Sequence, residues 1–147
     1  MYEKLLVSTD GSVLSNKAVS TAARLAHALR AKLLVLHVRS PIEVPHHVQG
    51  GAVNTLGENK IMQEIEDEER TLLDASLEIA ASNGVTAETA FVADEDPSHA
   101  IIRIAQEQRC DFIVMASHSR SGIAGLILGS ETQKVLTHST IPVMVVR

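Results

Sequence analysis

Short apolar runs alternate along this chain with segments of helical periodicity. The predicted strands are 4–9, 32–38, 86–92, 111–116 and 141–146. The predicted helices are 16–29, 60–82, 96–109 and 130–137. Most of the strands are almost continuously aliphatic, which is typical of a parallel sheet buried on both faces. The alternation of strand and helix therefore predicts an α/β fold, with helices on both faces of a parallel sheet.

Turn and cap residues indicate where these elements begin and end. Asp96 and Pro97 together predict the start of a helix, and Gly84 predicts the end of the long helix before it. The segment 40–57 contains several prolines and glycines and is predicted to be a mobile loop. The acidic run 64–69 is predicted to be the solvated face of the long helix, and Cys110 to be buried and unreactive.

Length and composition exclude several classes of protein. A chain of 147 residues predicts one domain, residues 1–147, that is large enough to bury a core. The net charge of −5, with no basic cluster and 2% aromatic residues, argues against a nucleic-acid binder. No segment has the roughly 18 apolar residues of a membrane span, so we expect a cytoplasmic protein without membrane contact. The histidines and the single cysteine lack metal-ligand spacing, and no metal site is expected.

The segment 115–132 carries the strongest functional signal. An apolar strand ends there in small and polar residues, and a helix is predicted to begin near Gly129 and Ser130. Such a loop can bind phosphate, because its backbone N–H groups and the positive end of the helix point at the anion. Asp10 follows the first strand and can accept hydrogen bonds from ribose hydroxyls. Together these features predict a nucleotide site at the carboxyl ends of the strands.

The chain resembles the universal stress protein family along nearly its whole length. The resemblance rests on the opening strand ending in STDGS, on LLVLHV, and on DFIVMASHSRSGIAGLILGS followed by ETQKVLTHSTIPVMVVR. ATP-binding members carry the motif G-x2-G-x9-G-[S/T] after the fourth strand. Here Gly129 and Ser130 keep the end of that motif, whereas Ala116 and Ser119 replace its first two glycines. Both replacements are small, and the Ser119 hydroxyl can bond a phosphate oxygen, so we favour retained nucleotide binding.

The resemblance implies an open five-stranded parallel sheet of order 3-2-1-4-5, in a Rossmann-like fold. It places Thr9 and Asp10 against ribose and adenine, and the backbone of Val38 at the adenine edge. Hydroxyl and N–H groups at the start of the last helix would contact the phosphates. The predicted binding residues are Thr9, Asp10, Val38, Met115, Ala116, His118, Ser119, Arg120, Gly129, Ser130, Glu131 and Thr132.

Simpler roles exist for several of these residues. Asp10 could only shape a turn or cap the following helix, and Ser130 could only cap the last helix. Val38 could be an ordinary core valine. Arg120 could be a solvated loop residue, and His118 could be a polar residue of a turn.

The favoured function is an adenine nucleotide-binding regulatory protein of the stress response. The ligand would be ATP or AMP, and Mg²⁺ could accompany a bound triphosphate through its phosphates. The apolar strand 142–146 is expected at a sheet edge, where relatives pair it with its copy, so we expect a homodimer. A nucleotide-free dimeric scaffold is the alternative, and a slow ATPase is a lesser one. The sequence contains no P-loop motif and no catalytic triad with supporting context.

Overall fold

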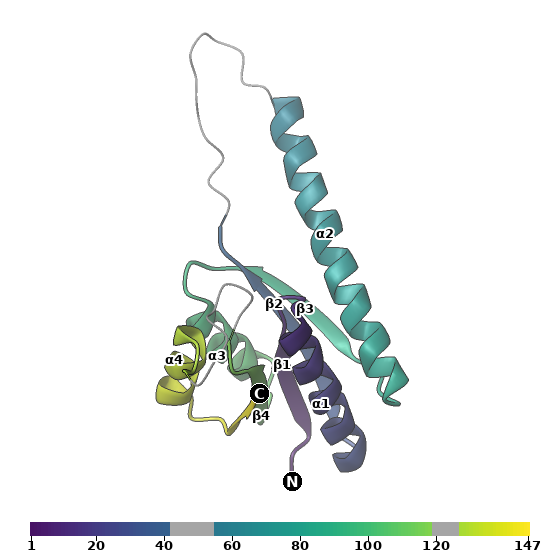
Figure 1. Ribbon diagram of the computed structural model, residues 1–147, viewed down its shortest axis with the longest axis vertical. Coiled ribbons are helices and arrows are strands. Elements are labelled where there is room, and N and C mark those ends of the chain that lie inside the picture. The colour runs from purple at the N-terminus through teal and green to yellow at the C-terminus, as the bar shows by residue number, and fades with distance from the viewer. Residues whose placement is uncertain (42–54, 119–126) are drawn as a thin grey trace.

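The computed structural model describes residues 1–41, 55–118 and 127–147 (Figure 1). The elements are β1 (Lys4–Ser8), α1 (Val13–Leu29), β2 (Lys32–Arg39), α2 (Thr55–Ser82), β3 (Glu88–Ala93), α3 (Pro97–Glu107), β4 (Phe112–Ala116), α4 (Ser130–His138) and β5 (Val143–Val146). The strands form one parallel sheet of order β3-β2-β1-β4-β5. The predicted α/β fold and its strand order are confirmed.

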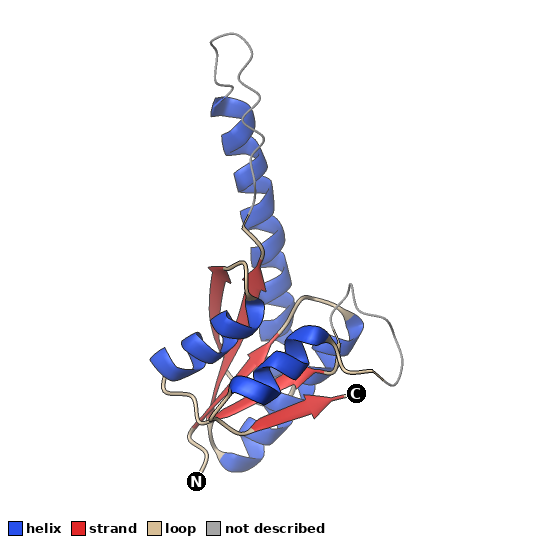
Figure 2. Cartoon of the chain, turned by 90° about the vertical axis from the view of Figure 1, so that its left-hand side faces the viewer, coloured by secondary structure: helices blue, strands red, loops and turns tan. Residues whose placement is uncertain are grey.

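Helices cover both faces of this sheet (Figure 2). Successive side chains of β1 point to opposite faces, so Leu5 and Val7 belong to one hydrophobic cluster and Leu6 to the other. The first cluster packs against α1 and α2, and the second against α3 and α4. Because both faces are covered, the middle of β1 is fully buried, as its continuous apolar sequence predicts.

Capping side chains set the helix boundaries. Helix α1 begins at Val13, three residues before its predicted start, because the Ser12 hydroxyl accepts a hydrogen bond from the Ser15 N–H at 3.2 Å. Asp96 caps α3 as predicted, and accepts from the His99 N–H at 3.2 Å. Gly84 adopts the positive φ of +80° that suits glycine just past the end of α2.

Helix α2 is longer than the sequence predicts. It begins at Thr55 instead of near residue 60, so residues 55–57 of the predicted loop are helical. Residues 42–54 of that loop lie outside the described residues. Figure 1 shows the first turns of α2 extending well beyond the end of the sheet. Among the described residues, no helix is both long and apolar enough to cross a membrane.

The acidic run on α2 is only partly a solvated face. Four of its carboxylates are exposed as predicted: Glu64, Glu66, Asp67 and Glu68. The prediction is wrong for Glu69, which is 7% exposed and lies 3.1 Å from the Arg39 Nε of β2. Glu69 shares the inward stripe of α2 with Leu73 and Ala80, four and eleven residues later, so its side chain faces the sheet.

Cys110 lies between α3 and β4 and is buried, as predicted. Burial raises the pKa of its thiol to about 11, and the neighbouring Lys4 ammonium opposes this shift only in part. The thiol therefore stays protonated near neutral pH, and it behaves as a small core side chain.

Candidate functional site

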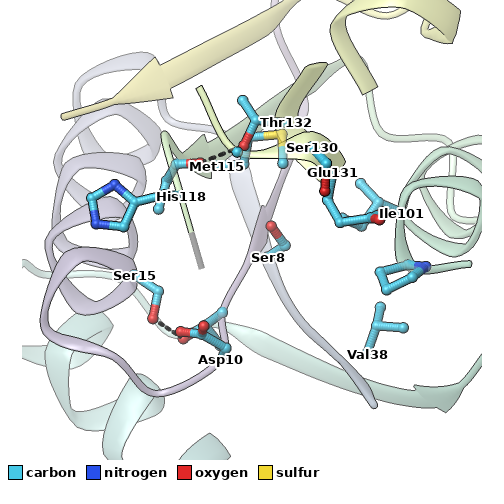
Figure 3. Close-up of a pocket in the computed structure, with 14 residues that line it drawn as sticks. Ser8, Asp10, Ser15, Val38, Ile101, Met115, His118, Ser130, Glu131 and Thr132 are labelled. Atoms are coloured by element: carbon cyan, nitrogen blue, oxygen red, sulfur yellow. Dashed lines mark hydrogen bonds between the residues drawn. The ribbon is translucent and has the colours of Figure 1, made fainter. Parts of the chain in front are cut away.

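A cavity of about 350 Å³ opens at the carboxyl ends of β1, β2 and β4 (Figure 3). Its lining residues are Ser8, Thr9, Asp10, Ser15, Val38, Pro97, Ile101, Met115, Ala116, His118, Gly129, Ser130, Glu131 and Thr132. Small-molecule pockets commonly have volumes of ~300–1,000 Å³. The cavity lies where the strand order reverses between β1 and β4, which is the usual ligand position in open parallel sheets.

Ten of the twelve binding residues predicted from the sequence line this cavity. The other two, Ser119 and Arg120, lie outside the described residues. The sequence interpretation did not include Pro97 and Ile101, which form a wall of the cavity from α3. A signal for them was available, because α3 follows β3 and must begin at the same edge of a parallel sheet.

The turn after β1 is held by its own side chains. The Thr9 hydroxyl is 3.0 Å from the Ser15 hydroxyl of α1, and it accepts from the Gly11 N–H at 3.2 Å. The Asp10 Oδ1 accepts from the Ser12 N–H at 2.9 Å. Asp10 therefore shapes the turn, one of its two proposed roles, and it also lines the cavity. These contacts hold the Asp10 side chain at the cavity wall before any ligand arrives.

The backbone of Val38 is directed toward this site. The Leu36 carbonyl accepts from the Thr9 N–H at 2.9 Å, whereas the Arg39 carbonyl accepts from the Asp94 N–H on the β3 side. Peptide groups along a strand alternate between its two sides, so the N–H and C=O of Val38 face the β1 side. The β1–β2 pairing ends at Leu36, so these two groups point past the end of β1.

Gly129 allows α4 to begin close to the end of β4. A Cβ at this position would lie 3.2 Å from the His118 Cα and 3.3 Å from the Ser117 carbonyl oxygen. The Gly129 N–H donates to that same carbonyl at 2.7 Å. The Thr132 hydroxyl donates to the Ala116 carbonyl at 2.9 Å, so the contribution of Thr132 to a ligand would come from its backbone (Figure 3). A side chain at position 129 would push these two elements apart.

The first turn of α4 has no side-chain cap. Its N-cap residue is Gly129, so Ser130 does not fill the simple capping role that the sequence allowed. The first N–H groups of a helix have no acceptor within the helix, and they carry the positive end of its dipole. The backbone N–H groups of this first turn therefore make this part of the cavity wall favourable for an anion. The lining residues of the turn are Ser130, Glu131 and Thr132.

Glu131 and His118 lie on opposite sides of the cavity (Figure 3). The Glu131 Oε2 accepts from the Ser98 N–H of α3 at 2.8 Å, and its Oε1 accepts from the Lys134 Nζ at 3.2 Å. The His118 Nδ1 is 3.4 Å from the Ser117 hydroxyl. Within the described parts of the chain, no three His, Cys, Asp or Glu side chains gather at a place that could hold a metal ion.

The cavity combines three chemical environments. Val38, Ile101 and Met115 provide apolar surface, Asp10 provides a carboxylate, and the start of α4 provides backbone N–H groups. A small molecule that contains an apolar heterocycle, a polyol and an anionic group would find a suitable surface in the cavity for each of these parts. This combination matches the parts of a nucleotide.

Comparison with known proteins identifies the family. The profile of the universal stress protein family matches residues 1–147. The chain belongs to this family. The resemblance seen in the sequence is thereby confirmed.

Several relatives match this universal stress protein along its full length. Universal stress protein YxiE of Bacillus subtilis is 37% identical over 149 residues, with all of both chains covered. A universal stress protein of Thermus aquaticus is 31% identical over 147 residues, again with full coverage of both. A solved universal stress protein in complex with cAMP is 26% identical, with a TM-score of 0.72. That match covers 99% of this chain and 97% of the solved chain.

Proposed function

We propose that this universal stress protein binds an adenine nucleotide, ATP or AMP, in the cavity between β1 and β4. In this role the protein is a nucleotide-dependent regulator of the stress response. The observation that carries the proposal is the uncapped start of α4, which faces the same cavity as Asp10 and the outward backbone of Val38. The cAMP bound by a relative of 26% identity supports an adenine ligand.

Each part of the nucleotide has a proposed contact. The adenine ring packs against Val38 and Ile101, with its edge bonded to the Val38 backbone. The ribose hydroxyls donate to the Asp10 carboxylate. A phosphate lies at the first turn of α4, where the helix dipole favours negative charge. Mg²⁺ would bind with a triphosphate through phosphate and water oxygens.

Calorimetric titration with ATP and AMP tests this proposal. In the variant Ser8→Leu, a larger apolar side chain would fill the centre of the cavity, where Figure 3 shows the Ser8 hydroxyl. We expect this variant to lose at least about tenfold in affinity, which corresponds to ~1.4 kcal/mol. The matched control is Ser82→Leu at the exposed end of α2, which should bind like the wild type. If the wild-type protein shows no heat of binding and carries no adenine nucleotide when purified, the scaffold alternative replaces the proposal.

We further propose that the protein forms a homodimer through β5. This strand is at the edge of the sheet and pairs with β4 alone within the described chain. The carbonyls of Pro142 and Val146 accept from the N–H groups of Ile113 and Ser117 on the β4 side, so the peptide groups of Val143 and Val145 point outward. An outward row of N–H and C=O groups favours pairing with another strand, and a two-fold contact closes as a dimer.

The variant Val145→Pro tests this interface, because proline removes one outward N–H group. We expect the variant to be monomeric in light scattering after size exclusion. Val145→Thr keeps the N–H group and similar side-chain volume, and it should remain dimeric. A wild-type protein that is monomeric at high concentration would contradict the dimer proposal.

A further inference from the structure

The first turns of three helices, α1, α3 and α4, line the cavity, and they differ in how they are capped. The Ser12 hydroxyl already caps α1 by accepting from the Ser15 N–H. Pro97 of α3 and Ser130 of α4 both belong to the lining. The start of α3 is already bonded to carboxylates, since Asp96 accepts from the His99 N–H and Glu131 accepts from the Ser98 N–H. The start of α4 has no side-chain cap. A ligand anion is therefore favoured at α4 and not at α3.

Glu131 is held in place on both of its carboxylate oxygens. Its Oε2 is 2.8 Å from the Ser98 N, and its Oε1 is 3.2 Å from the Lys134 Nζ. The contact with Ser98 joins α4 to α3, and the two contacts together hold the carboxylate in the lining of the cavity. The Lys134 side chain is 49% exposed, so solvent screens the positive charge that it contributes.

The charges along the described lining are unfavourable for a highly charged ligand. The described lining residues include the carboxylates of Asp10 and Glu131, and they include no lysine or arginine. Glu131 is itself in the first turn of α4, beside the N–H groups proposed to bind phosphate. AMP carries a charge of about −2 near neutral pH, and ATP carries about −4. Each added phosphate therefore brings more negative charge into a cavity that these carboxylates line.

We propose that Glu131 restricts this cavity to adenine nucleotides with a single phosphate group. This inference rests on the proposed function, and it assigns a specificity-determining role to one residue. The α4 turn holds one phosphate, and the Glu131 carboxylate repels the further phosphates of ATP. A protein with this preference reports the level of a monophosphate, either AMP or its cyclic form, and responds little to ATP.

The test compares adenosine, AMP, cyclic AMP and ATP by calorimetry, without Mg²⁺. In the wild type, AMP should bind at least about tenfold more tightly than ATP, from the repulsion between unit charges several ångströms apart. The variant Glu131→Gln keeps an oxygen that can accept from the Ser98 N–H but removes the charge. We expect the AMP-to-ATP affinity ratio to fall to within about threefold in this variant.

Two further variants separate a local effect from a change in net charge or stability. Glu107→Gln makes the same exchange at an exposed carboxylate of α3 that pairs with Arg103, and it should leave the ratio unchanged. Lys134→Gln removes the cation beside Glu131, and it should widen the preference for AMP. The change expected in Lys134→Gln is opposite in direction to that expected in Glu131→Gln. It tests the role of Glu131 even if the Glu131→Gln variant does not fold.

The outcomes distinguish this inference from the proposed function. If none of the four compounds binds, the proposed function itself fails. If AMP and ATP bind the wild type equally well, the role of Glu131 is refuted while nucleotide binding stands. The same holds if Glu131→Gln and Lys134→Gln both leave the ratio unchanged.

Discussion

The ion pair between Arg39 and Glu69 offers a quantitative test of how α2 is held on the sheet. The Arg39 Nε lies 3.1 Å from the Glu69 Oε1, and the two side chains are 18% and 9% exposed. The Arg39 guanidinium also lies 5.0 Å from the centre of the Phe91 ring. The Arg39 Nε and Nη1 and the Glu69 Oε2 are buried without a hydrogen bond of good geometry. Both charges are therefore desolvated with incomplete compensation.

Desolvation is the larger of the two opposing effects on Glu69. Burial raises the pKa of its carboxyl, and the electrostatic effect of the nearby Arg39 guanidinium lowers this pKa only in part. The pKa of Glu69 is higher in the folded state than in the unfolded state. As pH rises, Glu69 therefore loses its proton at a lower pH in the unfolded state than in the folded state. The charge on Glu69 thus lowers stability as pH increases from about 4.5 through the raised pKa.

The expected magnitudes follow from this balance. Two unit charges about 4 Å apart attract by about 4 kcal/mol at an effective dielectric constant of 20, and the desolvation of both groups offsets much of this. Glu69→Leu alone leaves Arg39 buried and unpaired, so we expect a loss of about 2–3 kcal/mol, below the range for fully buried pairs. The double variant Arg39→Met/Glu69→Leu should lie within about 1 kcal/mol of the wild type. For a chain of this size, the single variant should melt about 4–12 °C lower.

Urea unfolding of the wild type, the two single variants and the double variant forms a double-mutant cycle. The cycle measures the coupling free energy between Arg39 and Glu69. The exposed pair Arg103–Glu107 on α3 is the control, with an expected coupling below about 0.5 kcal/mol. Equal coupling in the two pairs would refute the argument that burial makes the α2 contact different. A double variant that is as unstable as Glu69→Leu would refute the claim that an apolar pair can replace the ions.

Three further predictions concern a buried thiol, a helix cap and a close backbone contact. With its pKa raised to about 11, Cys110 should react with iodoacetamide about 100-fold more slowly in the folded than in the unfolded protein, measured by mass spectrometry; equal rates would contradict its burial. The Ser98 hydroxyl and the His99 N–H lower the pKa of Asp96, so its stabilising effect is present above the unfolded pKa and is lost as pH falls through the lowered value. Asp96→Asn should therefore reduce the acid sensitivity of thermal melting, and an unchanged pH profile would oppose this. Gly129→Ala should cost about 1–3 kcal/mol in chemical unfolding, because its Cβ meets the backbone of residues 117 and 118; a neutral effect would show that the turn can relax.

The residues themselves, without any resemblance, predicted the parallel sheet and the place of the candidate site. Continuous apolar runs such as 32–38 predict buried parallel strands because the signal depends only on neighbouring residues. Asp96 and Pro97 predicted a helix start for the same reason, since a cap acts within one turn. The family resemblance added the strand order and most of the residues that line the cavity. These features are local in the chain or shared by all members of the fold.

Only the tertiary structure decided which distant residues meet. The sequence showed an acidic run, but the packing of α2 on β2 brings Glu69 to Arg39 and buries it. Glu131 contacts the Ser98 N–H across 33 residues, and no local pattern predicts which helix start a carboxylate will reach. The absence of a side-chain cap on α4 also follows from packing, because Gly129 must approach the end of β4 closely. Propensity and periodicity act over a few residues, whereas the charge and shape of the cavity depend on contacts between elements far apart in the chain.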